Sequence, residues 1–551
     1  RDIWDNMYGN INTANIVIEN VPLYYGEGPN KDIRLGEAHF MRAFDYFKLV
    51  QQYGGVPLKL KQSTVPEYEF TRSSEADVYN QIIEDFTKAY ELLPPDPAQR
   101  GRITKYAAAH FLAKVYLFRA SELYNSWNSA TKTSDLENAV RFADIVINSG
   151  KHQLADDYRE LWHFTTVDGP NEALSEVILA AQFSNNETTK GRYGNQVHLY
   201  YPSVYQNIPG MVRDIPGGRE FQRMRSTDYA LDVFDRVNDS RFWKSFKTEY
   251  LCNNPNGAPK WEAPYAPAGQ VGQPKFTGGQ VSIRYIVNNA GDNRYTAESI
   301  KYLAPHYYVR YFDGQTQNMT GNHGNYTVSQ YVALSKFADG SRINVASQFG
   351  QRDGIIARLA ETYLIAAEAL GRLNRYAEAL PYINAVRERA EYKNGEDRSF
   401  HSDGGVAYKN NSAVPATALV SYSDRNTYFE SNNIPVTTAS TSLTLNSVDD
   451  IFNSTRDFYD LLGATTQEDK FLNFILNERS RELMGELMRW PDLARTKKLI
   501  QRIRTFNVDA NAAQENKHYY RPIPQSFLES IRSNGQPLTA DQRQAMQNPN
   551  W

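Results

Sequence analysis

Aromatic and amide side chains gather in the middle of this 551-residue chain, and their types suit ligand recognition. The rings of Trp261, Tyr265, Tyr285 and Tyr295 offer flat apolar faces against which the C–H face of a sugar ring can pack. Around them lie amides that could bond sugar hydroxyls, at Asn253, Asn254, Asn256, Gln270 and Asn288. The segment therefore predicts a carbohydrate-binding surface with these four rings as contacts. The alternative for each single ring is that it fills a local core.

Signatures of catalysis are not found in the sequence. It contains no His-Glu-x-x-His, no Gly-x-x-x-x-Gly-Lys-Ser/Thr, no Gly-x-Ser-x-Gly and no EF-hand spacing, and its nine histidines are dispersed. Adjacent acids at Asp156-Asp157 and Asp449-Asp450 suit solvated helix caps better than a catalytic pair. We therefore predict no catalytic residues, no metal and no cofactor. A glycoside hydrolase stays open as an alternative, because two distant carboxylates can meet across a cleft.

Charge and cysteine content narrow the possible partners. The formal net charge is -3, with 60 basic and 63 acidic residues scattered along the chain, so nucleic acid is not an expected partner. The single cysteine, Cys252, excludes a disulfide framework and a thiolate metal cluster. No run of 18 or more apolar residues occurs, so no helix that spans a membrane is expected.

Helical periodicity brackets this middle region. Phe40, Phe44 and Phe47 repeat at separations of four and three, and Gly54 follows where glycine commonly ends a helix. Ser73 or Ser74 precedes the next periodic stretch as a candidate cap. Three helical hairpins are predicted in this way, with helices over residues 34–50 and 76–93, 104–124 and 136–148, and 359–370 and 376–386. Their length and their small alanines resemble tetratricopeptide repeats.

A fourth unit is predicted at residues 472–499. Leucines at separations of four and seven mark one helix face, and Pro491 should end the helix near Trp490. Arg479 lies on the same face. We expect it to be neutralised within a helix contact by the neighbouring acids Glu478, Glu482 and Glu486, with Trp490 as a packing residue.

Two irregular inserts separate these helices. Proline and glycine recur every few residues from 185 to 350, which forbids long helices there, and residues 395–455 are rich in Ser, Thr and Asn. The fold class is thus mostly α. We expect one domain over residues 1–551, whose helical scaffold comprises residues 1–150, 352–394 and 456–505 and whose binding surface lies on the inserts.

Several passages together resemble the RagB/SusD family of outer-membrane nutrient-binding lipoproteins of Bacteroidetes. The order of the motifs carries the resemblance over almost the whole chain. They are LGEAHFMRAFDYFKLVQQYGGVPL at 35–58, the Thr-Lys-x-Ala-Ala helix at 104–119, RLAETYLIAAEAL at 358–370, the Glu-Arg-x-x-Glu-Leu to Arg-Trp element at 478–499, Trp4, Tyr8, Ile11, Ala14 and Asn15 at the start, and Pro522-Ile523-Pro524 with Gln547-Asn548-Pro549 at the end.

The resemblance implies a non-catalytic protein with tetratricopeptide-like helices at the cell surface. Such a protein binds an oligosaccharide and delivers it to a SusC-like TonB-dependent transporter. The resemblance adds Tyr68, Asp32 and Arg34 to the expected ligand contacts, beside Trp261 and Tyr265. It also implies an outer-membrane location through a lipidated cysteine, which we expect in a segment preceding Arg1. A peptide ligand and a tetratricopeptide scaffold that binds only proteins remain alternatives.

Overall fold

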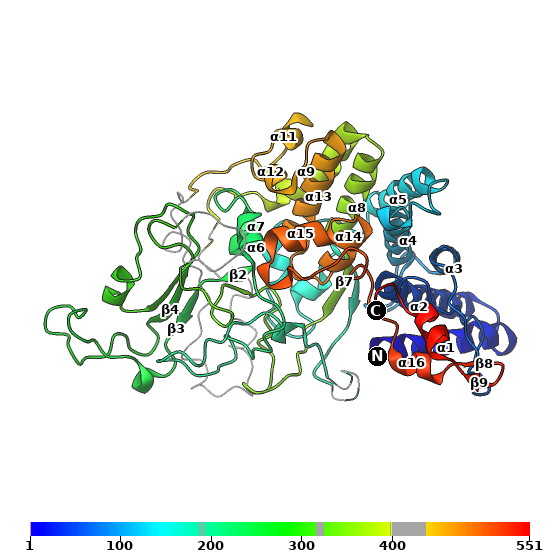
Figure 1. Ribbon diagram of the computed structural model, residues 1–551, viewed down its shortest axis with the longest axis horizontal. Coiled ribbons are helices and arrows are strands. Elements are labelled where there is room, and N and C mark those ends of the chain that lie inside the picture. Colours follow the sequence, from blue (N-terminus) through cyan, green and yellow to red (C-terminus); the bar gives the residue numbers. More distant parts are fainter. Residues whose placement is uncertain are drawn as a thin grey trace.

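The protein divides into a helical side and an irregular side, as Figure 1 shows. The computed structural model describes residues 2–186, 188, 191, 193–315, 324–396, 398 and 437–551. Most of the second predicted insert, residues 395–455, lies outside these ranges. The predicted class, mostly α with a large loop and short-strand region, is confirmed. In the described part of the chain, no helix is both long enough and apolar enough to cross a bilayer.

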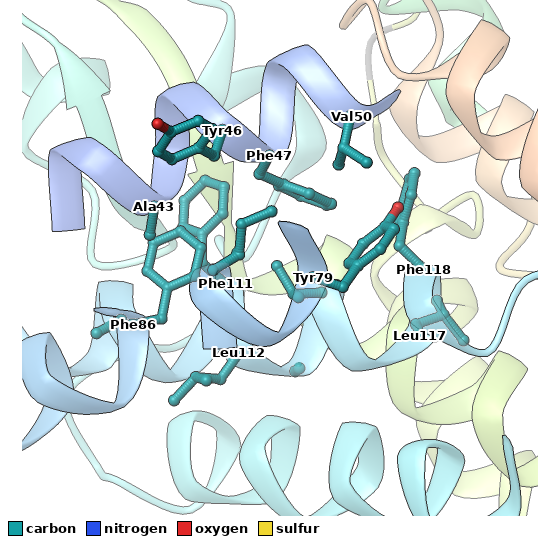
Figure 2. Packing of buried hydrophobic residues seen from close by; sticks show 14 of the residues in the cluster. Ala43, Tyr46, Phe47, Val50, Tyr79, Phe86, Phe111, Leu112, Leu117 and Phe118 are labelled. Carbon is teal, nitrogen blue, oxygen red and sulfur yellow. The ribbon is translucent and has the colours of Figure 1, made fainter. Parts of the chain in front are cut away.

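Five helices in chain order build the first part of the scaffold. Consecutive helices of this group pack side by side, from α1 on α2 through α4 on α5. Figure 2 shows the core between them, where buried Phe, Tyr, Leu and Val side chains from α2, α3 and α4 interdigitate. The helices are α1 (Asp2–Tyr24), α2 (Pro29–Tyr53), α3 (Glu75–Leu92), α4 (Lys105–Arg119) and α5 (Lys132–Ile147).

The helix ends follow the capping residues in the sequence. The Ser74 hydroxyl accepts a hydrogen bond from the Asp77 backbone N–H at 3.1 Å and caps α3. Thr104 caps α4 in the same way through the Ala107 N–H at 3.2 Å. Gly54 ends α2 with a φ of 70°, a conformation that costs glycine little. These three boundaries confirm the sequence prediction.

The second part of the scaffold holds α8 (Leu359–Arg372) and α9 (Tyr376–Ala390), with α8 also packed on α4, α5 and α13 (Gln467–Leu483). The prediction that a single helix runs to Trp490 is wrong. Helix α13 ends at Leu483, because Gly485 and Leu487 adopt left-handed conformations with φ of 79° and 60°. Pro491 instead lies within the first turn of α14 (Arg489–Arg495), where its missing N–H is harmless, and α15 (Leu499–Phe506) follows.

The irregular side is built from short strands and single helical turns. Strand β1 pairs with β7 and β2 with β6, both antiparallel, while β4 lies between antiparallel β3 and parallel β5. These strands are β1 (Val177–Ala181), β2 (Phe246–Lys247), β3 (Glu249–Leu251), β4 (Val281–Ile286), β5 (His306–Val309), β6 (Ala333–Leu334) and β7 (Gly354–Arg358). The short helices here are α6 (Asp228–Asp232) and α7 (Ser240–Trp243), while α11 (Asp449–Phe452) and α12 (Tyr459–Leu462) lie in the segment that leads into α13.

The C-terminal tail returns to the N-terminal helices. The Gln547 side chain bonds both backbone groups of Ile523, at 2.7 and 3.0 Å, and Asn548 donates to the Tyr53 carbonyl at 3.0 Å. Both tail motifs of the predicted family therefore meet at the end of α2. The tail contains α16 (Gln525–Ser530), the hairpin β8 (Arg532–Ser533) and β9 (Gln536–Pro537), and α17 (Ala540–Met546).

A buried ion network joins the two sides. Glu482 on α13 accepts hydrogen bonds from Arg358 at 2.6 Å, from Arg241 at 3.0 Å and from Arg389. All four side chains are buried. Burial by itself would raise the pKa of Glu482, but the three guanidinium groups hold it well below its usual range. Since Arg241 belongs to the irregular side and Glu482 to the scaffold, the network fixes one against the other.

Arg479 is buried and neutralised as expected, but by other partners. Its Nε donates to Asp492 at 2.7 Å and its Nη2 to Glu361 at 3.2 Å. The predicted acids bind other partners: arginines and a lysine from other segments form ion pairs with Glu478, Glu482 and Glu486. The prediction of Trp490 as a packing residue is also wrong, since 44% of its surface is exposed.

Candidate functional site

A large cleft lies between the irregular side and the segment that leads into α13. It has a volume of 1140 Å³ and opens to solvent. One wall is formed by residues 232–237 and Asn289, which follow α6 and β4. The other is formed by residues 452–465, which include α12, with Lys470 of α13 and Thr505 of α15 at its base. Both walls consist of loops and single turns carried by longer elements.

The first wall is anchored by an acid held between two arginines. Asp232 accepts two hydrogen bonds from Arg310 at 2.6 Å and pairs with Arg236 at 2.9 Å. Burial would raise the pKa of Asp232, but the two guanidinium groups lower it to about 2. Arg236 also donates to the Asn289 side chain, which ties this loop to the end of β4.

The second wall contains a residue with an unusual backbone conformation. Phe458, just before α12, has a φ of 60°, a left-handed conformation that costs a non-glycine residue about 1–2 kcal/mol. Its ring packs on Phe506 and Tyr229, with centroids 5.3 and 5.6 Å apart. The preceding Asp457 accepts from Arg481 of α13 at 2.7 Å. Packing and this ion pair together hold the strained turn in place.

The cleft combines rings with polar groups that can exchange hydrogen bonds. Phe458 contributes partly exposed apolar surface, whereas Phe452 and Tyr459 are each only 7% exposed, and polar side chains surround them. Arg456 spans the opening toward Asp235, with 3.6 Å between nitrogen and oxygen, and 62% of its side chain is exposed. The polar lining is Asp235, Asn289, Asn453, Ser454, Thr455, Arg456, Asp460 and Thr465. This arrangement suits a polyhydroxylated ligand, because it offers donors and acceptors beside flat carbon surface.

Two of the predicted aromatic contacts are buried. Tyr285 is fully buried because β4 is the central strand of its sheet, and its ring stacks on Tyr308 at 5.2 Å. Trp261 is 6% exposed, and the ammonium group of Lys275 lies 4.5 Å from the centre of its ring. Neither ring can serve as an exposed sugar platform in this conformation. Here the core alternative holds.

The other two predicted rings of the insert are half-buried. Tyr265 meets Tyr302 edge to face at 5.1 Å, and Lys301 donates to the Tyr265 hydroxyl at 3.3 Å. Half of the Tyr302 surface is exposed, which makes this pair the accessible aromatic feature of the loop. Tyr295 packs at a tilt on Tyr307 at 5.8 Å. These rings remain predicted ligand contacts.

The three predicted residues near the first helices lie far from the insert. Asp32 is exposed in the first turn of α2, and Arg34 pairs with Glu37 at 2.7 Å. Tyr68 is 48% exposed, with Arg532 of β8 over its ring at 5.3 Å. In Figure 1, α2 and β8 lie on the right, whereas β3 and β4 lie on the left. The structure therefore does not gather the seven predicted residues into one site.

The residues of the cleft were not predicted from the sequence. Several are short polar side chains in turns, at Asp235, Asn453, Ser454 and Thr455, and turns use these residues for structural reasons. Asp235, for example, accepts from the Val237 backbone N–H at 3.1 Å. Only the juxtaposition of two segments more than 200 positions apart reveals the cleft. In the described ranges, no group of three or more His, Cys, Asp or Glu side chains could hold a metal ion.

Comparison with known sequence families gives two matches. The SusD family model matches residues 175–551, and a SusD-like model described as starch-binding associating with outer membrane matches residues 1–117. The SusD-like protein P2 of Formosa agariphila is 24% identical over 399 residues, which cover 71% of this chain and 63% of the relative. The SusD-like protein P38 of the same organism is 23% identical over 503 residues, covering 90% and 72%. The chain thus spans less than two thirds of the length of P2.

Solved structures show the same fold at low identity. A SusD homolog from Bacteroides thetaiotaomicron aligns with a TM-score of 0.60 and 20% identity, over 100% of this chain and 85% of the other. Surface glycan-binding protein A from Bacteroides fluxus gives 0.58 and 17%, over 100% and 85%. A laminarin-binding SusD-like protein gives 0.57 and 18%, over 100% and 86%. Since the SusD family model also covers more than half of the sequence, the predicted resemblance is confirmed, and the chain belongs to the SusD/RagB family.

Proposed function

We propose that this protein binds an oligosaccharide nutrient at the cell surface without converting it, and delivers it to a SusC-like TonB-dependent transporter. Family membership supports the class of function. Of two proteins with the same fold, one is named as laminarin-binding and the other as a surface glycan-binding protein. The proposed location is the outer membrane, through a lipid anchor in a segment that precedes Arg1, in keeping with the description of the family model that matches residues 1–117.

The observation that carries this proposal is the 1140 Å³ cleft, in which hydrogen-bonding side chains and the partly exposed ring of Phe458 line one open space. Its size accommodates several sugar rings rather than a single small molecule. Arg456 and Asp235 stand at the opening, where they can exchange their 3.6 Å ion pair for hydrogen bonds to hydroxyls. A non-catalytic role needs no more than such reversible contacts.

Affinity electrophoresis against a panel of soluble polysaccharides tests the proposal. We expect at least one glycan to retard the full chain, and Arg456→Ala combined with Asp235→Asn to reduce that retardation at least tenfold in apparent affinity. Tyr24→Ala is the matched control, because Tyr24 is an 81% exposed aromatic residue at the end of α1. A cleft variant that binds as tightly as the control would show that the glycan does not occupy the cleft.

The predicted aromatic pair offers a second place on the same protein. Tyr302→Ala and Tyr265→Ala remove the accessible rings of the insert without touching the cleft. If only these variants lose glycan binding, the insert is the binding surface and the sequence prediction for Tyr265 is correct. Loss in both sets would indicate one extended ligand that reaches both.

Rival functions give different results in parallel assays. Peptide binding predicts retention on immobilised peptides with no retardation by any glycan, since tyrosine, asparagine and aspartate suit both ligands. A scaffold that binds only proteins predicts neither retention on peptides nor retardation by a glycan. A glycoside hydrolase predicts sustained release of reducing ends from the bound glycan, which a binding protein does not produce. Copurification of the full-length lipoprotein with a TonB-dependent barrel tests the delivery step.

A further inference from the structure

A second, smaller pocket lies between α6 and the turn that joins α13 to α14. It has a volume of 280 Å³, and carbon atoms dominate its lining. Tyr201, Tyr229 and Leu483 are buried walls, whereas Met224 and Leu487 are 38% and 54% exposed and connect the lining to the surface. The pocket shares no lining residue with the 1140 Å³ cleft.

Cations outnumber anions in this lining. It contains three arginines, Arg225, Arg479 and Arg489, but one carboxylate, that of Asp492. Both oxygens of Asp492 are occupied, because Oδ2 accepts from Arg479 at 2.7 Å and Oδ1 accepts from Arg495 at 2.9 Å. Asp492 is also buried. Two other arginines therefore neutralise the only acid of the lining, and it does not balance Arg489.

Arg489 has only uncharged partners. Its Nη1 donates to the Leu476 carbonyl at 2.7 Å and its Nη2 to the Tyr229 hydroxyl at 3.0 Å, and no carboxylate of the described residues pairs with it. The side chain is partly exposed, and its Nε is neither bonded nor sealed from solvent. By contrast, Arg225 pairs with Asp509. An anion that enters the pocket can thus pair with Arg489 without displacing an internal acid.

A second arginine without an acid lies behind the pocket wall. Arg502 is 2% exposed, and its Nη1 lies 3.5 Å from the Tyr229 hydroxyl. Its stronger bonds go to oxygens of Asn473 and Asn477, which are uncharged, and within the described ranges it forms no ion pair with a carboxylate. Burial would raise the pKa of Tyr229, but the charges of Arg489 and Arg502 lower it. This wall of the pocket therefore favours negative charge.

The volume and walls define the remainder of the ligand. A cavity of about 150 Å³ lined by apolar side chains suffices for benzene, so 280 Å³ holds an aromatic ring with a short substituent. Met224, Met484 and Met488 line the space, and methionine adapts its shape to a bound ring. The ligand that fits both the walls and the charge is an apolar ring that carries an anionic group.

We propose that this pocket binds a small carboxylate with an apolar ring, whose carboxylate pairs with Arg489. The proposal does not depend on oligosaccharide binding, because the pocket and the cleft share no lining residue. Glycan retardation and carboxylate binding are separate measurements, so the failure of one proposal is distinguishable from the failure of the other.

Methyl NMR of the full chain, labelled at the methionine methyl groups, tests the pocket directly. Three of the eight methionines line it. We expect phenylacetate to shift the methyl signals of Met224, Met484 and Met488 but not those of Met7, Met41, Met211 and Met546. Phenylacetamide keeps the ring but lacks the charge, and it should bind roughly tenfold more weakly. Phenethylamine, which is a cation, should bind more weakly still.

A charge variant assigns the preference to one side chain. Arg489→Gln should bring the affinities for phenylacetate and phenylacetamide to within about twofold of each other, because the ring still fits but the charge has lost its partner. Arg141→Gln is the matched control. Arg141 on α5 also lies over an aromatic ring, that of Phe142 at 4.0 Å, and bonds the uncharged Asn138, but it does not line the pocket. This control should keep the tenfold preference.

Several results would overturn the proposal. They are equal affinity of the wild type for phenylacetate and phenylacetamide, shifts spread over all methionines, and no shifts at millimolar phenylacetate. A preference for phenylacetate that persists in Arg489→Gln would also overturn it, because the anion would then pair with another cation. Dispersed methyl signals show that each variant is folded, and the wild-type titrations decide the ligand class even if Arg489→Gln fails to fold.

Discussion

Replacing Glu482 by glutamine tests whether the buried ion network holds the irregular side on the scaffold. The change keeps the shape of the side chain but removes the charge that three arginines share. Breaking a buried ion pair costs about 3–5 kcal/mol. Each guanidinium keeps another carboxylate, since Arg241 pairs with Asp239 at 2.7 Å and both Arg358 and Arg389 with Glu176 at 2.9 Å. We therefore expect the lower end, a loss of about 3 kcal/mol at pH 7.

The pH dependence of this loss has a definite sign. The network holds the pKa of Glu482 well below its usual range in the folded protein, whereas in the unfolded chain it titrates near pH 4.3. The stability that its charge contributes is thus complete above about pH 5 and falls by about 1.4 kcal/mol per unit below pH 4.3. Glutamine does not titrate. The difference between wild type and variant should shrink from about 3 kcal/mol at pH 7 to about 1 kcal/mol at pH 3.

Urea unfolding followed by tryptophan fluorescence measures both quantities. The matched control is Glu84→Gln, which breaks an exposed pair with Lys88 at 2.6 Å on α3 and should cost at most about 0.5 kcal/mol at either pH. A Glu482→Gln protein as stable as this control would refute the role of the network. A large loss that stays constant between pH 7 and pH 3 would refute its electrostatic origin.

Three other changes have defined outcomes. Ser74→Ala removes the cap of α3 and should cost about 1 kcal/mol in urea unfolding. Gly371→Ala should lower the thermal midpoint, because its new Cβ would lie 1.8 Å from Phe471, while Gly9→Ala, with nothing within 4 Å, should not lower it. The charge of Asp232 stabilises the wild-type protein, and this contribution is lost as the pH falls from about 4 toward the folded pKa of about 2. Asp232→Asn should lack this contribution at every pH, which acid unfolding of both proteins measures.

The helical part of the fold was predictable because local rules decide it. Repeats of apolar residues at three and four positions located α2 and α8, and Ser74 and Gly54 fixed helix ends that the structure reproduces within a few residues. Helix α1 also carries such a repeat, since Trp4, Ile11, Ala14 and Asn15 are its buried face, but it was noted only as a family motif. The break after Leu483 had one local signal, Gly485, which adopts a left-handed conformation, whereas the left-handed leucine at 487 depends on tertiary packing.

The candidate site was predictable in kind but not in position. Aromatic composition indicates a binding surface or a tyrosine-rich core, and the sequence does not separate the two. The insert buries many of its rings in a small core of its own. Tyr205 and Tyr250 stack there with centroids 5.2 Å apart, and Tyr285 is fully buried. Trp261, Tyr265 and Tyr302 lie outside the strands, so the exposure of each ring depends on which distant segments cover it, a non-local property. Tyr193 and Tyr302, which stay 51% and 50% exposed, had no distinguishing signal in the sequence.

Helix α13 links the family motif to the proposed binding surface. Arg481 donates to Asp457, and Asp457 is followed by the strained Phe458 that turns the chain into the wall of the cleft. The same arginine donates to Glu478 at 2.8 Å, which in turn pairs with Arg241 at 2.9 Å on the irregular side. A charged helix face that suggests only internal packing therefore fixes both walls at once. Because packing and these ion pairs together hold the loops of the cleft, weakening the pairs should impair ligand binding before the helical scaffold unfolds.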